Sequence, residues 1–177
     1  MILDPLDMKN STFFPEEVML HRFVVGHRWE EEEQKIAVVR PWGFERCENP
    51  CGGLVSNVID QLRYARFHMG DGSTQTGERL LQPGTLQLMQ TPAVKGDMTW
   101  MGLNWFIWDI GGIRFIDHDG STNGQQAALW FSPEKKLAFT ALTNEQRGFL
   151  LHGELTRWVR KNFLGVEEKE PAVIDLP

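Results

Sequence analysis

The feature that most limits the possible folds is a series of apolar segments in the second half of the chain, separated by very short turns. Gly111-Gly112 is typical of a two-residue hairpin turn, and Ser132-Pro133-Glu134-Lys135 has the composition of a tight turn. Connections this short join neighbouring antiparallel strands. The pattern therefore predicts an antiparallel run of three or four strands, drawn from residues 103–109, 113–117, 126–131 and 137–143.

Three helices are expected around these strands. Residues 56–69 carry apolar side chains at helical spacing, and Ser56 is a suitable N-cap because its hydroxyl can accept a backbone N–H of the first turn. A shorter helix is expected over residues 83–90, and a longer helix with an apolar stripe over residues 147–163. Helices beside antiparallel strands predict an α+β fold, in which an antiparallel sheet is flanked by helices.

The first third of the chain is less regular. Residues 21–27 and 36–40 predict a hairpin whose exposed tip is the acidic run Glu30–Glu33, because adjacent like charges favour solvent. Before the hairpin, Pro15-Glu16-Glu17 is typical of a single helical turn. After it, residues 41–55 contain helix-breaking Pro, Gly and Asn and are expected to form a long connection.

Composition narrows the class of protein. The chain has 177 residues, 41% of them hydrophobic, so one domain with a real core is expected. The net charge of −6 argues against a nucleic-acid partner, which selects a basic surface. The apolar stretches are too short for a membrane span, and the acidic N-terminal segment is unlike a signal peptide. The chain as it stands is therefore expected to be cytoplasmic, although an upstream region could carry an export signal.

Two cysteines, Cys47 and Cys51, flank the turn-forming Pro50. A structural metal site needs about four ligands, and no second Cys or Cys/His pair lies at a suitable spacing, so we expect no metal and no cofactor. Two free thiols are favoured over a local disulfide, because Pro50 forms a turn without help from sulfur.

Several segments, in order along the chain, resemble motifs of one family. They are Leu3–Phe13 ("P-L-G-M-x-x-T"), Gly52–Asp60 ("G-G-L-x-S-T-x-x-D"), Gly102–Trp105 ("G-L-G-W"), His118–Gly124 ("H-x-G-x-x-x-G"), and the closing segments Phe131–Pro133 and Leu142–Asn144. The set resembles the C-terminal half of the β-lactamase-related, penicillin-binding-protein-like serine hydrolases. This resemblance implies part of a β-lactamase/transpeptidase-like fold over residues 1–165, followed by a tail over 166–177.

The resemblance also implies a site. Family members acylate a Ser in a Ser-x-x-Lys motif, and a Lys-Thr-Gly or His-x-Gly motif lies on a strand facing that nucleophile. His118 stands at the Lys or His position of this third motif, and the backbone N–H of Ser121 would be an oxyanion donor. Gly120 would let the substrate approach the backbone. The substrate-binding positions implied are Gly120, Asp119, Thr122 and Asn123.

Two positions depart from the family pattern. Asp7 stands where Gly is usual, and Asp119 stands where Gly or Thr is common. The charge of Asp119 would lie beside the pocket, which makes an anionic substrate less suitable.

The first two catalytic motifs are not found in the sequence. Ser132 and Lys135 fit Ser-x-x-Lys literally, but Pro133 and Glu134 between them indicate a turn between strands rather than a helix start. Tyr64 is the only Tyr and is expected to pack on its helix. The remaining histidines are expected to be surface or packing residues: His21, His27, His68 and His152.

The sequence therefore predicts a portion of a serine hydrolase that acts on esters, β-lactams or D-amino-acid peptides, and that is inactive alone. Its expected partner is the missing N-terminal half of the same domain or a second copy of the chain, because an open sheet edge favours association. The alternative is a non-catalytic binding or dimerisation module that retains the fold. A self-contained enzyme using Ser132 and Lys135 ranks last.

Overall fold

The computed structural model describes residues 2–41 and 45–168. Its main feature is a six-stranded sheet in which every neighbouring pair is antiparallel and the strands follow one another in chain order. The strands are β3 (Val94–Lys95), β4 (Trp100–Met101), β5 (Phe106–Ile110), β6 (Ile113–Thr122), β7 (Gln125–Ser132) and β8 (Leu137–Thr143).

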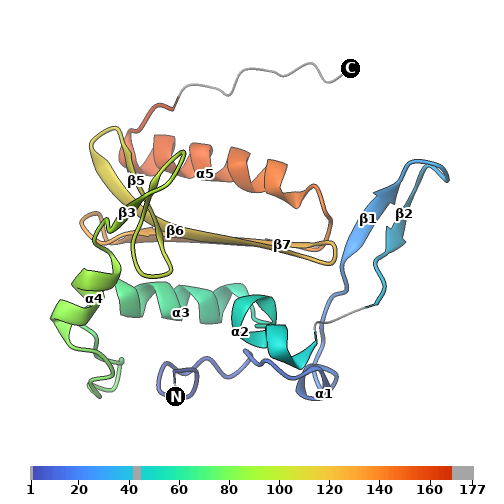
Figure 1. Cartoon of the computed structure of the whole chain (residues 1–177), viewed down its shortest axis with the longest axis horizontal. Coiled ribbons are helices and arrows are strands. Elements are labelled where there is room, and N and C mark those ends of the chain that lie inside the picture. The colour runs from blue at the N-terminus through green and yellow to red at the C-terminus, as the bar shows by residue number, and fades with distance from the viewer. Residues whose placement is uncertain (1, 42–44, 169–177) are drawn as a thin grey trace.

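Two long helices cover the two faces of this sheet. Helix α3 (Val58–His68) lies on one face and helix α5 (Gly148–Leu164) on the other, with α4 (Pro83–Met89) beside α3 (Figure 1). The arrangement confirms the predicted α+β fold with an antiparallel sheet flanked by helices. All three predicted helices are present within about two residues of their expected bounds.

The alternation of side chains along the strands gives each face its own core. On the α3 face, Ala65, Trp105, Ile107, Ile116 and Phe131 are buried together. Full burial of a large apolar side chain such as Phe131 contributes about 2–3 kcal/mol. Most of the stability of the sheet therefore comes from this layer and the one opposite.

The α5 face is built around Phe115 and Trp130, which are packed with Ile113 and Val166. The guanidinium of Arg160 lies over both rings, 4.2 Å from the Phe115 centroid and 5.1 Å from that of Trp130. The predicted tail thus begins with a buried residue, Val166. Residues 169–177 of that tail lie outside the described residues.

The N-terminal segment is held against helix α3 by hydrogen bonds to one buried carboxylate, that of Asp60. Asp60 is fully buried and accepts hydrogen bonds from the backbone N–H of Asn10 and the hydroxyl of Ser11, both at 2.9 Å. Arg63 pairs with Asp60 at 2.9 Å and also with Asp7 at 3.0 Å. Two of the motif segments recognised in the sequence are therefore held together by Asp60.

The predicted N-cap of this helix is wrong by one residue. Asn57 caps α3, because its side-chain oxygen accepts the backbone N–H of Asp60 at 2.9 Å. Ser56 instead shares a hydrogen bond of 2.8 Å with Ser11.

The hairpin of the first third exists but begins later than predicted. Strand β1 (His27–Glu30) pairs with β2 (Lys35–Val38), so the acidic run covers the last residue of β1 and the first part of the tip. Residues 21–25 form no strand in the structure, since they are largely exposed and pair with no neighbouring strand. Short helices precede and follow the hairpin: α1 (Pro15–Val18), the 3-10 helix η1 (Arg46–Glu48) and α2 (Asn49–Gly52).

Two further differences concern the sheet. The β3–β4 hairpin was not predicted, because strands of two residues carry no periodic signal. The strand expected from Leu103 begins only at Phe106, because Asn104 has a left-handed backbone with φ 61° and interrupts the extended chain. The Gly111-Gly112 turn is as predicted, with both φ values positive.

Candidate active site at the open edge of strand β6

Strand β6 is longer than its neighbour β5, and this leaves part of one edge unpaired. The β5–β6 ladder ends at the pair Phe106 and Asp117, whereas the β6–β7 ladder continues to Thr122 and Gln125. Residues His118–Thr122 are therefore paired with β7 on one side only. Their backbone offers hydrogen-bonding groups on the free side, to solvent or to a ligand.

The polar composition of residues 118–124 is typical of a turn, but most of this segment is strand. Only Asn123 and Gly124 form the turn, with φ values of 37° and 76°, and the five residues before them are strand. The strand is polar because its edge is not buried by another strand. The Asn-Gly dipeptide, a strong hairpin signal, was the clue that could have located the turn.

Alternation along β6 separates the predicted site residues into two groups. Ile116 packs on the α3 face and Phe115 on the α5 face, so His118, Gly120 and Thr122 project toward the α3 face. Asp119 and Ser121 project toward the α5 face. The structure thus brings His118 and Gly120 together on the α3 face. It places the side chains of Asp119 and Ser121 on the α5 face.

His118 lines a cavity of about 260 Å³ whose remaining wall is the segment Met101–Phe106. Its imidazole lies 5.5 Å from the Phe106 ring, and its Nδ1 is 2.8 Å from the carbonyl oxygen of Asp119. A donor Nδ1–H in this contact would leave Nε2 as the acceptor atom. The side chain is otherwise exposed.

The cavity wall is positioned by a close approach of backbone at Gly102. A Cβ added at Gly102 would lie 2.2 Å from the carbonyl oxygen of Met89, at the end of α4. The same carbonyl accepts the backbone N–H of Leu103 at 3.0 Å. Residue 102 must therefore be glycine for the segment to reach α4.

Gly120, unlike Gly102, is not in close contact with a neighbouring backbone. A Cβ added there would meet only the Cβ of Ala127, at an ordinary contact distance of 3.6 Å. The packing of the sheet does not require a glycine at this position.

The charge of Asp119 does not lie on the side expected from the sequence. Burial raises the pKa of Asp119, while the opposite charges of His152, His118 and Arg160 lower it. His152 and Arg160 belong to α5, so the carboxylate lies on the α5 face of the strand, although its charge also acts on His118. The Ser121 side chain also lies on the α5 face, where its hydroxyl accepts a hydrogen bond of 2.8 Å from the Gln126 amide.

The literal Ser-x-x-Lys match is a turn, as predicted. Ser132 is the last residue of β7 and is fully buried, whereas Lys135 is exposed in the turn that follows. The hydroxyl has no hydrogen-bond partner among the described residues. The buried hydroxyl is therefore closed off from substrate, and within the described residues it lacks the hydrogen-bonded base of an activated serine.

The other candidate side chains are packed as predicted. His68 lies among the rings of Tyr64, Phe67, Trp105 and Phe131, and burial lowers its pKa to about 4. His152 is buried with Nε2 3.1 Å from the hydroxyl of Thr143.

Among the residues that the structure describes, three or more His, Cys, Asp or Glu side chains nowhere gather in a way that could hold a metal ion. Cys47 and Cys51 are exposed free thiols. None of the helices within the described ranges has both the length and the apolar character of a membrane span.

Comparison with known proteins places this geometry in a family. The family model described as Beta-lactamase matches residues 1–160, which is most of the chain and includes the whole of β6 and the His118 cavity. The chain belongs to the Beta-lactamase family. This beta-lactamase relative is 28% identical to penicillin-binding protein 4 of Amycolatopsis lactamdurans over 151 residues, which cover 81% of this chain and 39% of the other.

Solved structures agree on the fold. The octameric penicillin-binding protein homologue from Pyrococcus abyssi superposes with a TM-score of 0.74 at 23% identity, covering 93% of this chain and 36% of that one. A class C beta-lactamase from Rhodobacter sphaeroides superposes with a TM-score of 0.71 at 15% identity, covering 93% of this chain and 52% of that one. The chain thus spans only about a third to a half of the proteins it resembles.

Proposed function

We propose that this chain supplies one wall of the acyl-transfer site of a serine hydrolase, and that the nucleophile belongs to polypeptide outside these 177 residues. The observation that carries the proposal is the unpaired edge of β6 at His118–Thr122, bordered by a cavity of about 260 Å³. Membership of the Beta-lactamase family supports the assignment. The proposed substrates are esters, β-lactams or D-amino-acid peptides.

The residues of this edge other than Asp119 have a role in the proposed reaction. The attacking serine hydroxyl adds to the substrate carbonyl carbon, and the oxygen of that carbonyl gains negative charge. The backbone N–H of Ser121 is the proposed donor to this oxygen, and one such donor contributes on the order of 3 kcal/mol to the transition state. His118 faces the cavity and would bind or exchange a proton with the reacting groups.

Gly120 would let the substrate approach the backbone of β6, since the packing of the sheet does not require a glycine there. A Cβ there would make only an ordinary contact with Ala127, so a side chain at 120 would project to the α3 face beside the free edge without disturbing the fold. Thr122 and Asn123 would contact the substrate farther along the same edge. Collapse of the tetrahedral adduct breaks the bond from the carbonyl carbon to the leaving alcohol or amine, which takes up the proton lost by the serine, and an acyl-serine ester remains. Water then hydrolyses this ester, which releases the acid and regenerates the hydroxyl.

The missing partner has a candidate docking surface. Strand β8 is one of the two outer strands of the sheet, and large apolar side chains of the helices beside it are exposed in the described structure. They include Ile59 and Leu62 of α3, and Phe149, Leu150, Leu151 and Trp158 of α5. An N-terminal half that adds a strand to β8 would cover them.

The test assays the chain alone and with the polypeptide encoded immediately upstream of Met1, supplied in trans. A fluorescent serine-reactive acyl probe and a chromogenic cephalosporin report acylation and turnover. We expect no labelling of the chain alone, and labelling of the upstream polypeptide in the complex that falls at least about a hundredfold with His118→Ala. A well-folded complex without activity would contradict the proposal.

The second candidate function is a non-catalytic binding or dimerisation module. It is favoured by the two helix-covered cores, which the chain forms from its own residues. This function predicts cooperative unfolding and no labelling in any combination. Labelling of Ser132 in the chain alone would instead support the self-contained enzyme.

A further inference from the structure

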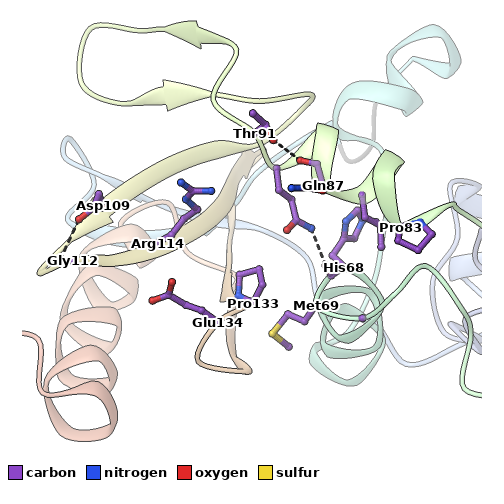
Figure 2. A pocket seen from close by; sticks show the side chains of 13 residues that line it. His68, Met69, Pro83, Gln87, Thr91, Asp109, Gly112, Arg114, Pro133 and Glu134 are labelled. Atoms are coloured by element: carbon purple, nitrogen blue, oxygen red, sulfur yellow. Dashed lines mark hydrogen bonds between the residues drawn. The ribbon is translucent and has the colours of Figure 1, made fainter.

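A second and larger cavity, of about 500 Å³, lies on the α3 face of the sheet and shares no lining residue with the His118 cavity. Four elements line it and leave it open to solvent: the end of α3, helix α4, the β5–β6 hairpin and the turn after β7. Figure 2 shows Arg114, Pro133 and Glu134 on the sheet side, with His68, Met69 and Gln87 on the helix side. Arg114 is four residues before His118 on one strand, about 13 Å along it.

The sheet side of this cavity carries one positive and one negative group that are not used by the fold. Neither Arg114 nor Glu134 takes part in a salt bridge within the described residues. Asp109 lies opposite Arg114 in the β5–β6 ladder, but its carboxylate accepts the backbone N–H of Gly112 at 3.1 Å. Arg114 and Glu134 are therefore available to a ligand with charges of both signs.

The helix side of the cavity includes a buried histidine. His68 is only 3% exposed and lines the cavity, and its Nδ1 has no hydrogen-bond partner within the part of the chain that the structure describes. The Nδ1 atom itself is not accessible from the cavity, so it is not a contact point for a ligand. Met69, Leu86 and Pro83 give the same side an apolar lining.

We propose that this cavity is a binding site, separate from the His118 cavity, for a short zwitterionic peptide with apolar side chains. Its carboxylate would pair with the Arg114 guanidinium in the bidentate geometry that Arg favours, and its ammonium group with Glu134. An apolar side chain would lie against Met69 and Leu86, close to the imidazole of His68. The proposal does not depend on hydrolase activity.

The test measures binding of the dipeptide leucyl-leucine to the intact chain by isothermal titration calorimetry. We expect saturable binding with one site, and at least about tenfold weaker binding by Arg114→Ala and by Glu134→Gln, since each removes a charge-assisted contact. The same dipeptide acetylated and amidated at its ends should bind at least about tenfold more weakly to the unchanged chain.

Two variants serve as controls, each checked for folding by its thermal unfolding midpoint. Lys135→Ala changes a charge in the same turn as Glu134 but outside the cavity lining, and should leave binding unchanged. His118→Ala should also leave it unchanged. No binding to the unchanged chain, equal binding of the blocked dipeptide, or loss of binding in His118→Ala would each overturn the proposal.

Discussion

At the scale of single residues, a half-buried carboxyl and a buried imidazole on opposite faces of the sheet change the stability in opposite directions as the pH changes. Burial raises the pKa of Asp117 from 3.8 to about 7; the neighbouring Asp119 acts in the same direction, and Trp108 and Arg160 act against it. Burial lowers the pKa of His68 from 6.5 to about 4. Between these pH values the folded protein keeps a proton on Asp117 and keeps one off His68.

The signs follow from comparing folded and unfolded chains. The stability due to Asp117 is fully present below about pH 4 and is lost as the pH rises toward 7, because the unfolded chain has released that proton. The stability due to His68 is fully present above about pH 6.5 and is lost as the pH falls toward 4. Each contribution to the free energy of unfolding changes by about 1.4 kcal/mol per pH unit, so the two largely cancel between about pH 4 and pH 6.5.

The cancellation gives a prediction for Asp117→Asn. Without the Asp117 contribution, the free energy of unfolding of the variant should rise relative to the parent by about 1.4 kcal/mol per pH unit between about pH 4.5 and 6.5. Urea unfolding followed by tryptophan fluorescence measures both curves. Parallel pH dependences of variant and parent would contradict the assignment.

At the scale of elements, the N-terminal segment and α3 depend on one another through Asp60. Asp60→Ala removes the acceptor for Ser11 and for the backbone N–H of Asn10, and it leaves Arg63 without its buried partner. We expect a loss of about 3 kcal/mol in the free energy of unfolding.

Asp71→Ala is the matched control for Asp60→Ala. Asp71 also pairs with an arginine, Arg79, at 2.9 Å, but on the surface, so its removal should shift the urea midpoint little. Equal effects of the two substitutions would show that the buried network does not hold the segment.

Elements with a strong apolar period were predictable, and those shaped by tertiary contacts were not. Helix α5 follows from its apolar period, although most of that stripe is exposed, and strand β8 follows from its apolar run between two turns. The strand at 118–122 was hidden because its free edge permits Gly, Ser and Thr, which resemble a turn. The cavity wall at Gly102–Trp105 depends on a backbone contact with Met89 that no local pattern encodes. His118 was identified only through its motif, and the cavity around Arg114 had no sequence signal.

At the scale of the whole molecule, the exposed apolar residues of α5 lie beside an outer strand without charged residues. Phe149, Leu150 and Trp158 are 56%, 59% and 57% exposed. A patch of this kind is typical of a surface covered by another polypeptide.

This patch gives a prediction for the isolated chain. We expect it to self-associate at micromolar concentration, and the combined substitutions Leu150→Lys and Trp158→Lys to shift it toward the monomer, since both sites are exposed and lie outside the cores. Light scattering after size exclusion gives the mass of each. As a control, Leu88→Lys places a charge on α4 at a 61% exposed site away from β8. A monomeric parent, or an equal effect of the control, would contradict the prediction.

The contact between Gly102 and the carbonyl oxygen of Met89 joins the two hollows of the α3 face. Helix α4, which ends at Met89, lines the cavity beside Arg114. The segment that follows Gly102 forms the wall of the His118 cavity. Any side chain larger than hydrogen at 102 must push these two backbones apart. The shapes of the two cavities are therefore coupled, and a substitution selected to alter one cavity would also alter the other.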